Sequence, residues 1–190
     1  MKQFLLFVIA VLSSLQIVPA QNSLDFVVKD DALRVVYMNG EKKSEKKTSI
    51  TISEKGKMAG YKIKAADSYL TVSLPAKQTC SVFKIGYFVN SPIGAENSVF
   101  FTVEYNATQD IQMKFKFAYY ANLQKEKESY ASEIITFPKT NSNKHLSFDL
   151  SSKIKGDYKG ILYFFAEHTT PLQEDGILNI KHIHIGKNQE

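Results

Sequence analysis

Apolar and polar residues alternate along most of this chain, in short runs separated by turn residues. The alternation is clearest in residues 111–120. One face of this segment carries Ile111, Met113, Phe115, Phe117 and Tyr119. The other face carries Gln112, Lys114, Lys116, Ala118 and Tyr120. A period of two residues is that of a β-strand with one buried face. One half-buried sheet cannot cover this many aromatic side chains, so the pattern predicts a second sheet packed against the first.

Runs of the same kind recur through the rest of the chain. They predict strands at residues 25–28, 32–37, 48–53, 61–65, 69–74, 81–89, 98–105, 134–137, 146–150, 161–168 and 177–185. Gly, Pro and Asn punctuate these runs about every ten residues. No amphipathic helix is predicted, and only residues 151–155 suggest a helical turn. Regular short strands with such turns favour an all-β fold, and we predict an antiparallel β-sandwich.

Residues 1–20 are typical of a secretory signal peptide. Lys2 gives a positive start, residues 4–12 form an apolar core, and Ala20 stands at a cleavage point before Gln21. The apolar run is too short to span a bilayer. We therefore predict a signal peptide at residues 1–20 and a single domain at residues 21–190. This domain is expected to be extracellular, or periplasmic in a Gram-negative cell, with no membrane span.

Composition narrows the classes of partner. The chain has 24 Lys and Arg against 19 Asp and Glu, a formal net charge of +5, and one cysteine. A lone Cys80 cannot form an intramolecular disulfide, so the core alone must hold the domain, and we expect Cys80 to be buried. Nucleic-acid readers rely on clustered Arg, whereas this basic excess is almost wholly Lys. We predict no nucleic-acid partner, and we interpret the charged run at residues 41–47 as a solvated loop.

The C-terminal residues 157–186 carry a family resemblance. They read as two apolar strands joined by a polar connection. The segment from Gly160 to Glu167, together with Gly176-Ile177-Leu178-Asn179-Ile180, resembles the closing hairpin of galactose-binding-like jelly rolls, the fold of many secreted carbohydrate-binding modules. The resemblance implies a sandwich of jelly-roll type. Where that family often has a calcium-binding Asp, this chain has Lys181, so no calcium site is expected.

Signatures of catalysis are absent from the sequence. It has no G-x-S-x-G elbow, no phosphate-binding loop and no H-E-x-x-H motif. Sandwich-fold glycosidases and lyases use paired carboxylates, but Asp149 and Glu167 stand isolated and are interpreted as solvated strand residues. We predict a protein that is not an enzyme and that needs no cofactor.

Three histidines near the C-terminus form the sharpest local feature. On a strand, His182 and His184 would project from one face, and His168 on the preceding strand could reach the same metal ion. The pattern also fits histidines that continue the partly buried face of Leu178 and Ile180, with their nitrogens bonded to neighbours. We favour this second interpretation and predict no metal site.

Aromatic and amide residues indicate where a sugar would bind. Sugar rings stack their apolar faces on flat side chains, and their hydroxyls bond planar polar groups. The candidate ligand-binding residues are Tyr87, Asn90, Tyr119, Tyr120, Asn122 and Gln124. Because the chain has no Trp, the predicted surface is shallow.

These observations predict a secreted, non-catalytic domain that binds a glycan or polysaccharide. One alternative is a protein-interaction or adhesion module with another surface protein as partner, which requires a contiguous exposed apolar patch. A second is a sandwich-fold glycosidase or polysaccharide lyase, which requires two carboxylates converging in a cleft. In a eukaryotic source, Asn106-Ala107-Thr108 would be a glycosylation acceptor, and we expect it in an exposed turn.

Overall fold

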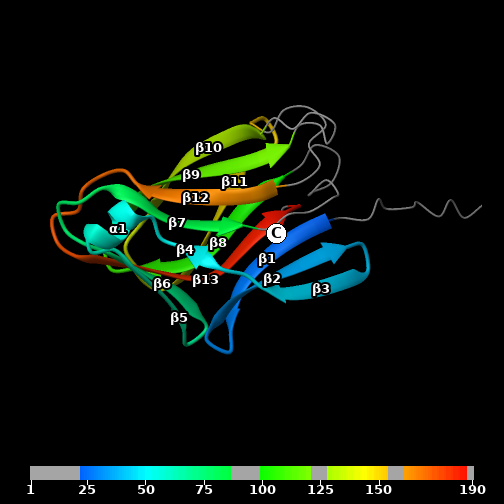
Figure 1. Ribbon diagram of the computed structural model, residues 1–190, viewed down its shortest axis with the longest axis horizontal. Helices are drawn as coiled ribbons and strands as arrows, with labels where there is room; N and C mark the ends of the chain where they lie inside the picture. The colour runs from blue at the N-terminus through cyan, green and yellow to red at the C-terminus, as the bar shows by residue number, and fades with distance from the viewer. Residues whose placement is uncertain (1–21, 87–98, 121–127, 154–160, 188–190) are drawn as a thin grey trace, which may run out of the picture.

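The computed structural model consists of two antiparallel β-sheets packed face to face (Figure 1). It describes residues 22–86, 99–120, 128–153 and 161–187. The eight-stranded sheet contains β1 (Asn22–Lys29), β2 (Ala32–Asn39), β3 (Lys42–Lys47), β5 (Lys62–Ala66), β6 (Tyr69–Leu74), β8 (Phe100–Ala107), β11 (Thr140–Asp149) and β13 (Gly176–Gly186). The five-stranded sheet contains β4 (Ile50–Thr51), β7 (Cys80–Gly86), β9 (Ile111–Tyr120), β10 (Glu128–Phe137) and β12 (Ile161–His168). The prediction of an all-β sandwich is confirmed.

The strand order is that of a jelly roll. From β6 to β13 the chain passes back and forth between the two sheets, and among the strands that the structure describes there, only β9 and β10 follow each other within one sheet. The resulting neighbours are β6, β13, β8 and β11 in one sheet and β7, β12, β9 and β10 in the other. Two interleaved four-stranded sheets of this kind define the jelly roll. The hairpin β1–β2 and strand β3 then extend the larger sheet.

The last strand, β13, holds the larger sheet together. It pairs with β8 along one side, while its other side pairs first with β6 and then with β1. A β-bulge interrupts the pairing with β8 between Ile180 and His182. A bulge adds one residue and reverses which side chains face inward. Leu178 and Ile180 therefore point into the core before the bulge, and Ile183 and Ile185 do so after it.

The core lies between the two sheets and is rich in aromatic rings. Phe101 of β8 lies 5.0 Å from Phe115 and 5.1 Å from Phe117 of β9, measured between ring centroids. These contacts join the two sheets, and tilted ring pairs of this kind stabilise cores beyond the area they bury. The alternating pattern predicted for residues 111–117 is confirmed, because all four apolar side chains on that face are fully buried.

Two tight turns are set by local backbone conformation. Asp30 and Asp31 join β1 to β2 with φ of 52° and 53°, and Asp67 and Ser68 join β5 to β6 with φ of 52° and 66°. Two successive residues with positive φ match the right-handed twist of the paired strands. Asp and Ser tolerate that conformation better than bulky residues do.

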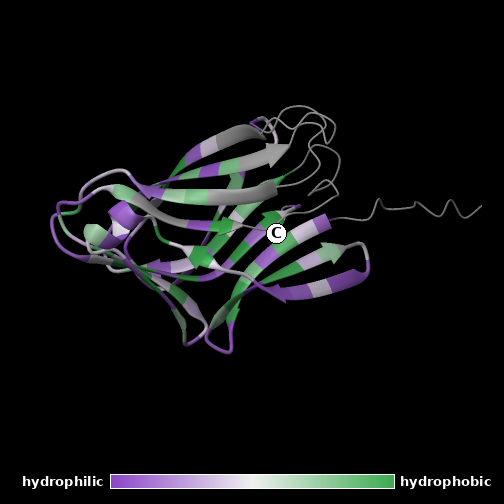
Figure 2. Ribbon diagram, in the orientation of Figure 1, coloured by the Kyte–Doolittle hydropathy of each residue, from purple (hydrophilic) through white to green (hydrophobic). Residues whose placement is uncertain are grey.

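Several sequence predictions need correction. The charged run at residues 41–47 is not a loop: Lys42–Lys47 forms the edge strand β3, although all six residues are exposed as expected, and Figure 2 shows it in hydrophilic colours. Lysines on an edge strand discourage pairing with other chains. The strand predicted at residues 48–53 is limited to β4, Ile50–Thr51, and a short helix that was not predicted, α1 (Glu54–Met58), follows it with Ser53 as its N-cap. Asn106 lies within β8 and not in a turn.

The two C-terminal strands do not form the expected hairpin. β12 pairs with β7 and β9 in the five-stranded sheet, whereas β13 belongs to the eight-stranded sheet. The polar segment between them therefore crosses from one sheet to the other. Within the described ranges, no helix is long and apolar enough to cross a membrane. The predicted signal peptide at residues 1–20 lies outside the described residues.

Candidate functional site

The structure places part of the predicted sugar-binding cluster at one end of the five-stranded sheet. Tyr119 and Tyr120 end β9, where Tyr119 pairs with Ile161 of β12. On the other side of β12, Gly86 ends β7 and pairs with Tyr163. The described ends of β7 and β9 thus flank the same strand, β12. The remaining candidates lie outside the described residues: Tyr87, Asn90, Asn122 and Gln124.

An aromatic side chain lies at the centre of the outer face of this sheet. Phe165 of β12 is partly exposed, because its neighbour Ala166 points into the core. Phe165 lies opposite Lys84 of β7 on one side and Lys116 of β9 on the other. The Lys84 ammonium lies 5.5 Å from the centroid of the Phe165 ring. An aromatic ring is thus presented to solvent between two cations.

The same face continues with charged and polar side chains along β9. Glu167 of β12 lies opposite Lys114, and the exposed Ile134 of β10 lies on the other side of Lys114. At the far end, the Thr170 hydroxyl donates a hydrogen bond to the Gln112 Oε1 atom over 2.7 Å. A cavity of about 180 Å³ opens there, lined by Asp110, Gln112, Thr136, Thr170 and Leu172. We name this surface the β9 face, defined by Lys84, Gln112, Lys114, Lys116, Ser132, Ile134, Thr136, Phe165 and Glu167.

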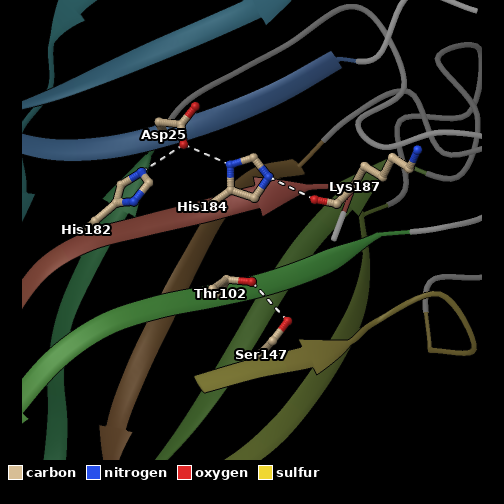
Figure 3. Close-up of polar contacts among 6 residues, drawn as sticks. All are labelled: Asp25, Thr102, Ser147, His182, His184 and Lys187. Carbon is tan, nitrogen blue, oxygen red and sulfur yellow. Dashed lines mark hydrogen bonds and ion pairs between the residues drawn. The ribbon is translucent and has the colours of Figure 1, made fainter. Parts of the chain in front are cut away.

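The opposite outer face, on the eight-stranded sheet, contains a cluster of two histidines and one carboxylate (Figure 3). The Oδ1 atom of Asp25 on β1 accepts from Nε2 of His182 and from Nδ1 of His184, each over 2.8 Å. The other nitrogen of His184, Nε2, lies 3.1 Å from the carbonyl oxygen of Lys187. Both ring nitrogens of His184 therefore lie within hydrogen-bond distance of an oxygen atom.

This hydrogen bonding controls the charge of Asp25. Burial alone would raise the pKa of the carboxyl group, but the hydrogen bonds from His182 and His184 outweigh burial and lower the pKa to about 2. The folded protein therefore stabilises the charged carboxylate form of Asp25.

The expectation that the two histidines continue the face of Leu178 and Ile180 is wrong. The bulge after Ile180 reverses the alternation, so His182 and His184 lie on the outer side of the sheet. Nε2 of His182 and both ring nitrogens of His184 are nevertheless bonded to neighbours, as predicted.

His168 does not join this cluster, because it lies in the other sheet. Its Nδ1 atom lies 2.8 Å from the Tyr61 hydroxyl, and both side chains are buried. Burial lowers the pKa of His168 and raises that of Tyr61 to about 12, so both groups are held neutral. Within the ranges that the structure describes, no three His, Cys, Asp or Glu residues could hold a metal ion.

A hydrogen-bonded ladder of polar side chains crosses the eight-stranded sheet beside the histidines. Asn179 donates to Asn106 over 2.8 Å, and Asn106 donates to Asn143 over 3.0 Å. Asn143 in turn donates to Glu104, which also pairs with Lys181. A groove of about 300 Å³ runs next to this ladder, and its lining residues are Val27, Val28, Ser68, Glu104, Lys181 and His182. These polar groups largely satisfy one another, which is typical of a cross-strand network that stabilises a sheet.

The two carboxylates considered for catalysis lie on different sheets. Asp149, at the end of β11, is exposed and accepts from the backbone amide of Ser151 over 2.8 Å. Glu167 belongs to the β9 face of the five-stranded sheet. The core separates them, so this pair cannot converge on one glycosidic bond.

Sequence reasoning missed two residues that organise these surfaces. Phe165 was assigned to a strand but not to a surface, because the segment around it is apolar on both faces and gives no alternation. Asp25 lies far from His182 and His184 in sequence, and only the pairing of β1 with β13 brings the three together.

Comparisons with known proteins agree with the fold. The chain matches no protein-family model and no curated protein in sequence. The structure named PfGH50B is similar over 75% of this chain and 23% of its own, with 12% identity and a TM-score of 0.53. A family 11 carbohydrate-binding module from Clostridium thermocellum, in complex with a β-1,3-1,4-mixed-linked tetrasaccharide, is similar over 88% of this chain and 98% of its own, with 10% identity and a TM-score of 0.47. The structure named BiXyn10A CBM1 is similar over 74% and 89%, with 15% identity and a TM-score of 0.47.

Proposed function

We propose that this protein is a secreted, non-catalytic domain that binds carbohydrate on the β9 face of its five-stranded sheet. The observation that carries the proposal is the position of Phe165. It is a partly exposed ring on the outer side of a sheet, with polar and charged side chains on the neighbouring strands. Similarity to solved structures at low sequence identity indicates the fold alone, so the proposal rests on the side chains around Phe165.

The β9 face offers both kinds of contact that a sugar needs. The ring of Phe165 supplies a flat apolar platform for the C–H face of a pyranose. Lys116 lies on the neighbouring strand β9, and Glu167 lies on β12, the strand that carries the ring. Both side chains can form hydrogen bonds with hydroxyl groups at the edge of the sugar. A face built on adjacent strands is long and open, which suits a polymer better than a single small molecule.

The residues predicted at the strand ends would extend this surface. We propose that Tyr119, Tyr120 and the loop residues near them contact the sugar units that lie beyond Phe165. Secretion is part of the proposal through the signal peptide expected at residues 1–20.

The described residues favour this function over protein adhesion. Their exposed large apolar side chains are Met58, Ile134 and Ile177. Ile134 lies in the five-stranded sheet and Ile177 in the eight-stranded sheet, so the two cannot form one patch. Adhesion through protein contacts requires such a patch.

Binding of the mature chain to a panel of neutral and acidic polysaccharides tests the proposal, by affinity electrophoresis and then by calorimetry. Phe165→Ala should weaken binding at least about tenfold, whereas Phe165→Tyr should keep it, because only the first removes the stacking platform. Tyr69→Ala is the matched control, since this aromatic residue lies on the other sheet and its hydroxyl bonds Asn143.

Unchanged circular dichroism of each variant is required before its binding is interpreted. If Phe165→Ala binds as well as the wild type while Tyr69→Ala binds worse, the site belongs on the eight-stranded sheet and the proposal fails. Absence of binding to any polysaccharide would direct attention to a protein partner.

A further inference from the structure

We infer that the carbohydrate recognised by the β9 face is acidic: a polysaccharide whose sugar units carry carboxylate groups. This inference rests on the proposed function and names the substrate class of the same site.

The described residues of the β9 face have an excess of positive charge. Lys84, Lys114 and Lys116 face outward there with Glu167, and Asp110 lies at the far end, where its carboxylate accepts from the backbone amide of Lys139. The nearby Glu133 of β10 already forms an ion pair with Lys153. A surface on which ammonium groups outnumber carboxylates around the aromatic ring attracts anionic polymers and repels cationic ones.

The lysines lie where a stacked acidic sugar would place its carboxylate. Neighbouring strands are about 4.8 Å apart, so Lys84 and Lys116 stand on the two sides of Phe165 at that spacing. A uronate carboxylate is attached directly to a ring carbon and extends from the edge of the ring. When such a sugar lies flat on Phe165, its carboxylate is directed sideways, toward one of these two ammonium groups.

A second cationic position follows along the strand. Lys114 and Lys116 are two residues apart on β9 and share its outer side, about 6.7 Å from each other along the strand. A row of cations along one strand fits a polymer with repeated negative charges, since successive units can each contact one ammonium group. A neutral polymer would gain only hydrogen bonds to its hydroxyl groups from this row, without the charge pairing.

The contact between Lys84 and the Phe165 ring does not block the site. Lys84 is exposed, and its ammonium lies 5.5 Å from the ring centroid. A cation over an aromatic ring at an exposed position is only weakly held. An arriving carboxylate offers this ammonium a stronger, charge-assisted partner, so Lys84 can turn from the ring to the ligand and leave the ring to the sugar.

The test compares a charged and a neutral polymer that share one sugar backbone. Polygalacturonate carries one carboxylate on each sugar unit, and its fully methyl-esterified form has the same backbone without the charge. The mature protein should bind polygalacturonate at least about tenfold more tightly at low salt, and the preference should shrink as salt is added. Dextran sulfate, compared with dextran, separates carboxylate recognition from a response to any polyanion.

Variants that remove lysine charges test which residues cause the preference for polygalacturonate. The double variant Lys84→Gln/Lys116→Gln should lose most of the preference for polygalacturonate, and Phe165→Ala should weaken binding of both forms. The matched control is Lys43→Gln/Lys46→Gln on β3, which removes the same charge from exposed positions of the other sheet and should leave the preference unchanged.

The outcomes separate this inference from the function on which it rests. If both polymers bind equally and only Phe165→Ala weakens them, the carbohydrate site stands and the acidic ligand is wrong. If both double variants reduce polygalacturonate binding alike, or if dextran sulfate binds and polygalacturonate does not, carboxylate recognition is overturned. If no polymer binds, the inference and the proposed function both fail.

Discussion

The carboxylate of Asp25 accepts a hydrogen bond from Nδ1 of His184 over 2.8 Å, and this bond joins the first strand of the domain to the last. The two residues are also directly opposite in the backbone register of β1 and β13. His184 is almost fully covered, with 4% of its side chain exposed, and 19% of the Asp25 side chain is exposed. Removing one partner of a partly desolvated pair of this kind costs stability, because the other partner stays buried without its hydrogen bond.

Replacing Asp25 should therefore destabilise the domain. We expect Asp25→Ala to lower the free energy of unfolding by about 1–3 kcal/mol, because it leaves a buried nitrogen of His184 without its acceptor. Urea denaturation followed by circular dichroism measures this change. The control is Asp30→Ala, which removes an exposed carboxylate paired with Arg34 and should change the stability by about 1 kcal/mol or less. Equal effects of both substitutions would contradict the special role of Asp25.

Stability should fall in acid through the same carboxylate. The pKa of Asp25 is lowered from 3.8 to about 2 in the folded protein, so the unfolded chain takes up this proton first as the pH decreases. The contribution of Asp25 is fully present above about pH 4 and is lost as the pH falls through about 2. Denaturation curves between pH 5 and pH 2 should show a steeper loss for the wild type than for Asp25→Asn. Parallel pH profiles for the two proteins would refute the lowered pKa.

The facing of β13 should tolerate the loss of Lys181 but not a further insertion. Lys181 is the extra residue of the bulge, so its deletion gives a regular strand in which Ile183 and Ile185 still point into the core. Inserting one Ala after Lys181 would instead turn His182 and His184 toward the core in place of these two isoleucines. We expect the insertion variant to be unfolded or to lose cooperative unfolding, as seen by calorimetry and by near-ultraviolet circular dichroism, and the deletion variant to unfold cooperatively. Lys181→Ala is the control, since it keeps the backbone and removes only an exposed ion pair with Glu104. An insertion variant as stable as this control would disprove the requirement for this facing.

Gly56 in the short helix α1 should resist substitution by Ala, although Ala is the better helix former. A Cβ atom at this position would lie 3.0 Å from Cγ2 of Ile52 and 3.1 Å from Sγ of Cys80. The gain of about 1 kcal/mol in helix propensity is then opposed by overpacking that costs about 1–3 kcal/mol. We expect Gly56→Ala to lower the thermal midpoint, whereas Lys55→Ala, on the exposed side of the same helix, should leave it within about a degree or two. A higher midpoint for Gly56→Ala would show that the core yields more easily than these distances suggest.

The alternation of the sequence determined which segments form the apolar strands and which of their residues are buried. Ile111, Met113, Phe115 and Phe117 recur with a period of two, and a strand is the only regular structure that places such residues on one face. The same local information predicted a sandwich, because an apolar face of this size requires a second sheet. It also predicted the burial of Cys80, which the structure confirms.

The tertiary structure alone decided how strands pair and which residues meet on each face. The charged run of β3 has no apolar alternation, so its place as an edge strand depends on pairing with β2 and not on its own sequence. The side of the sheet on which His182 and His184 lie is set by the bulge, in which Lys181 is the one extra residue. Their acceptor, Asp25, comes from the first strand of the domain. Phe165 became a surface residue because β12 lies between β7 and β9, which brought Lys84 and Lys116 to its two sides. Periodicity is a local property of the chain, whereas these neighbours are fixed by hydrogen bonds between segments that are distant in sequence.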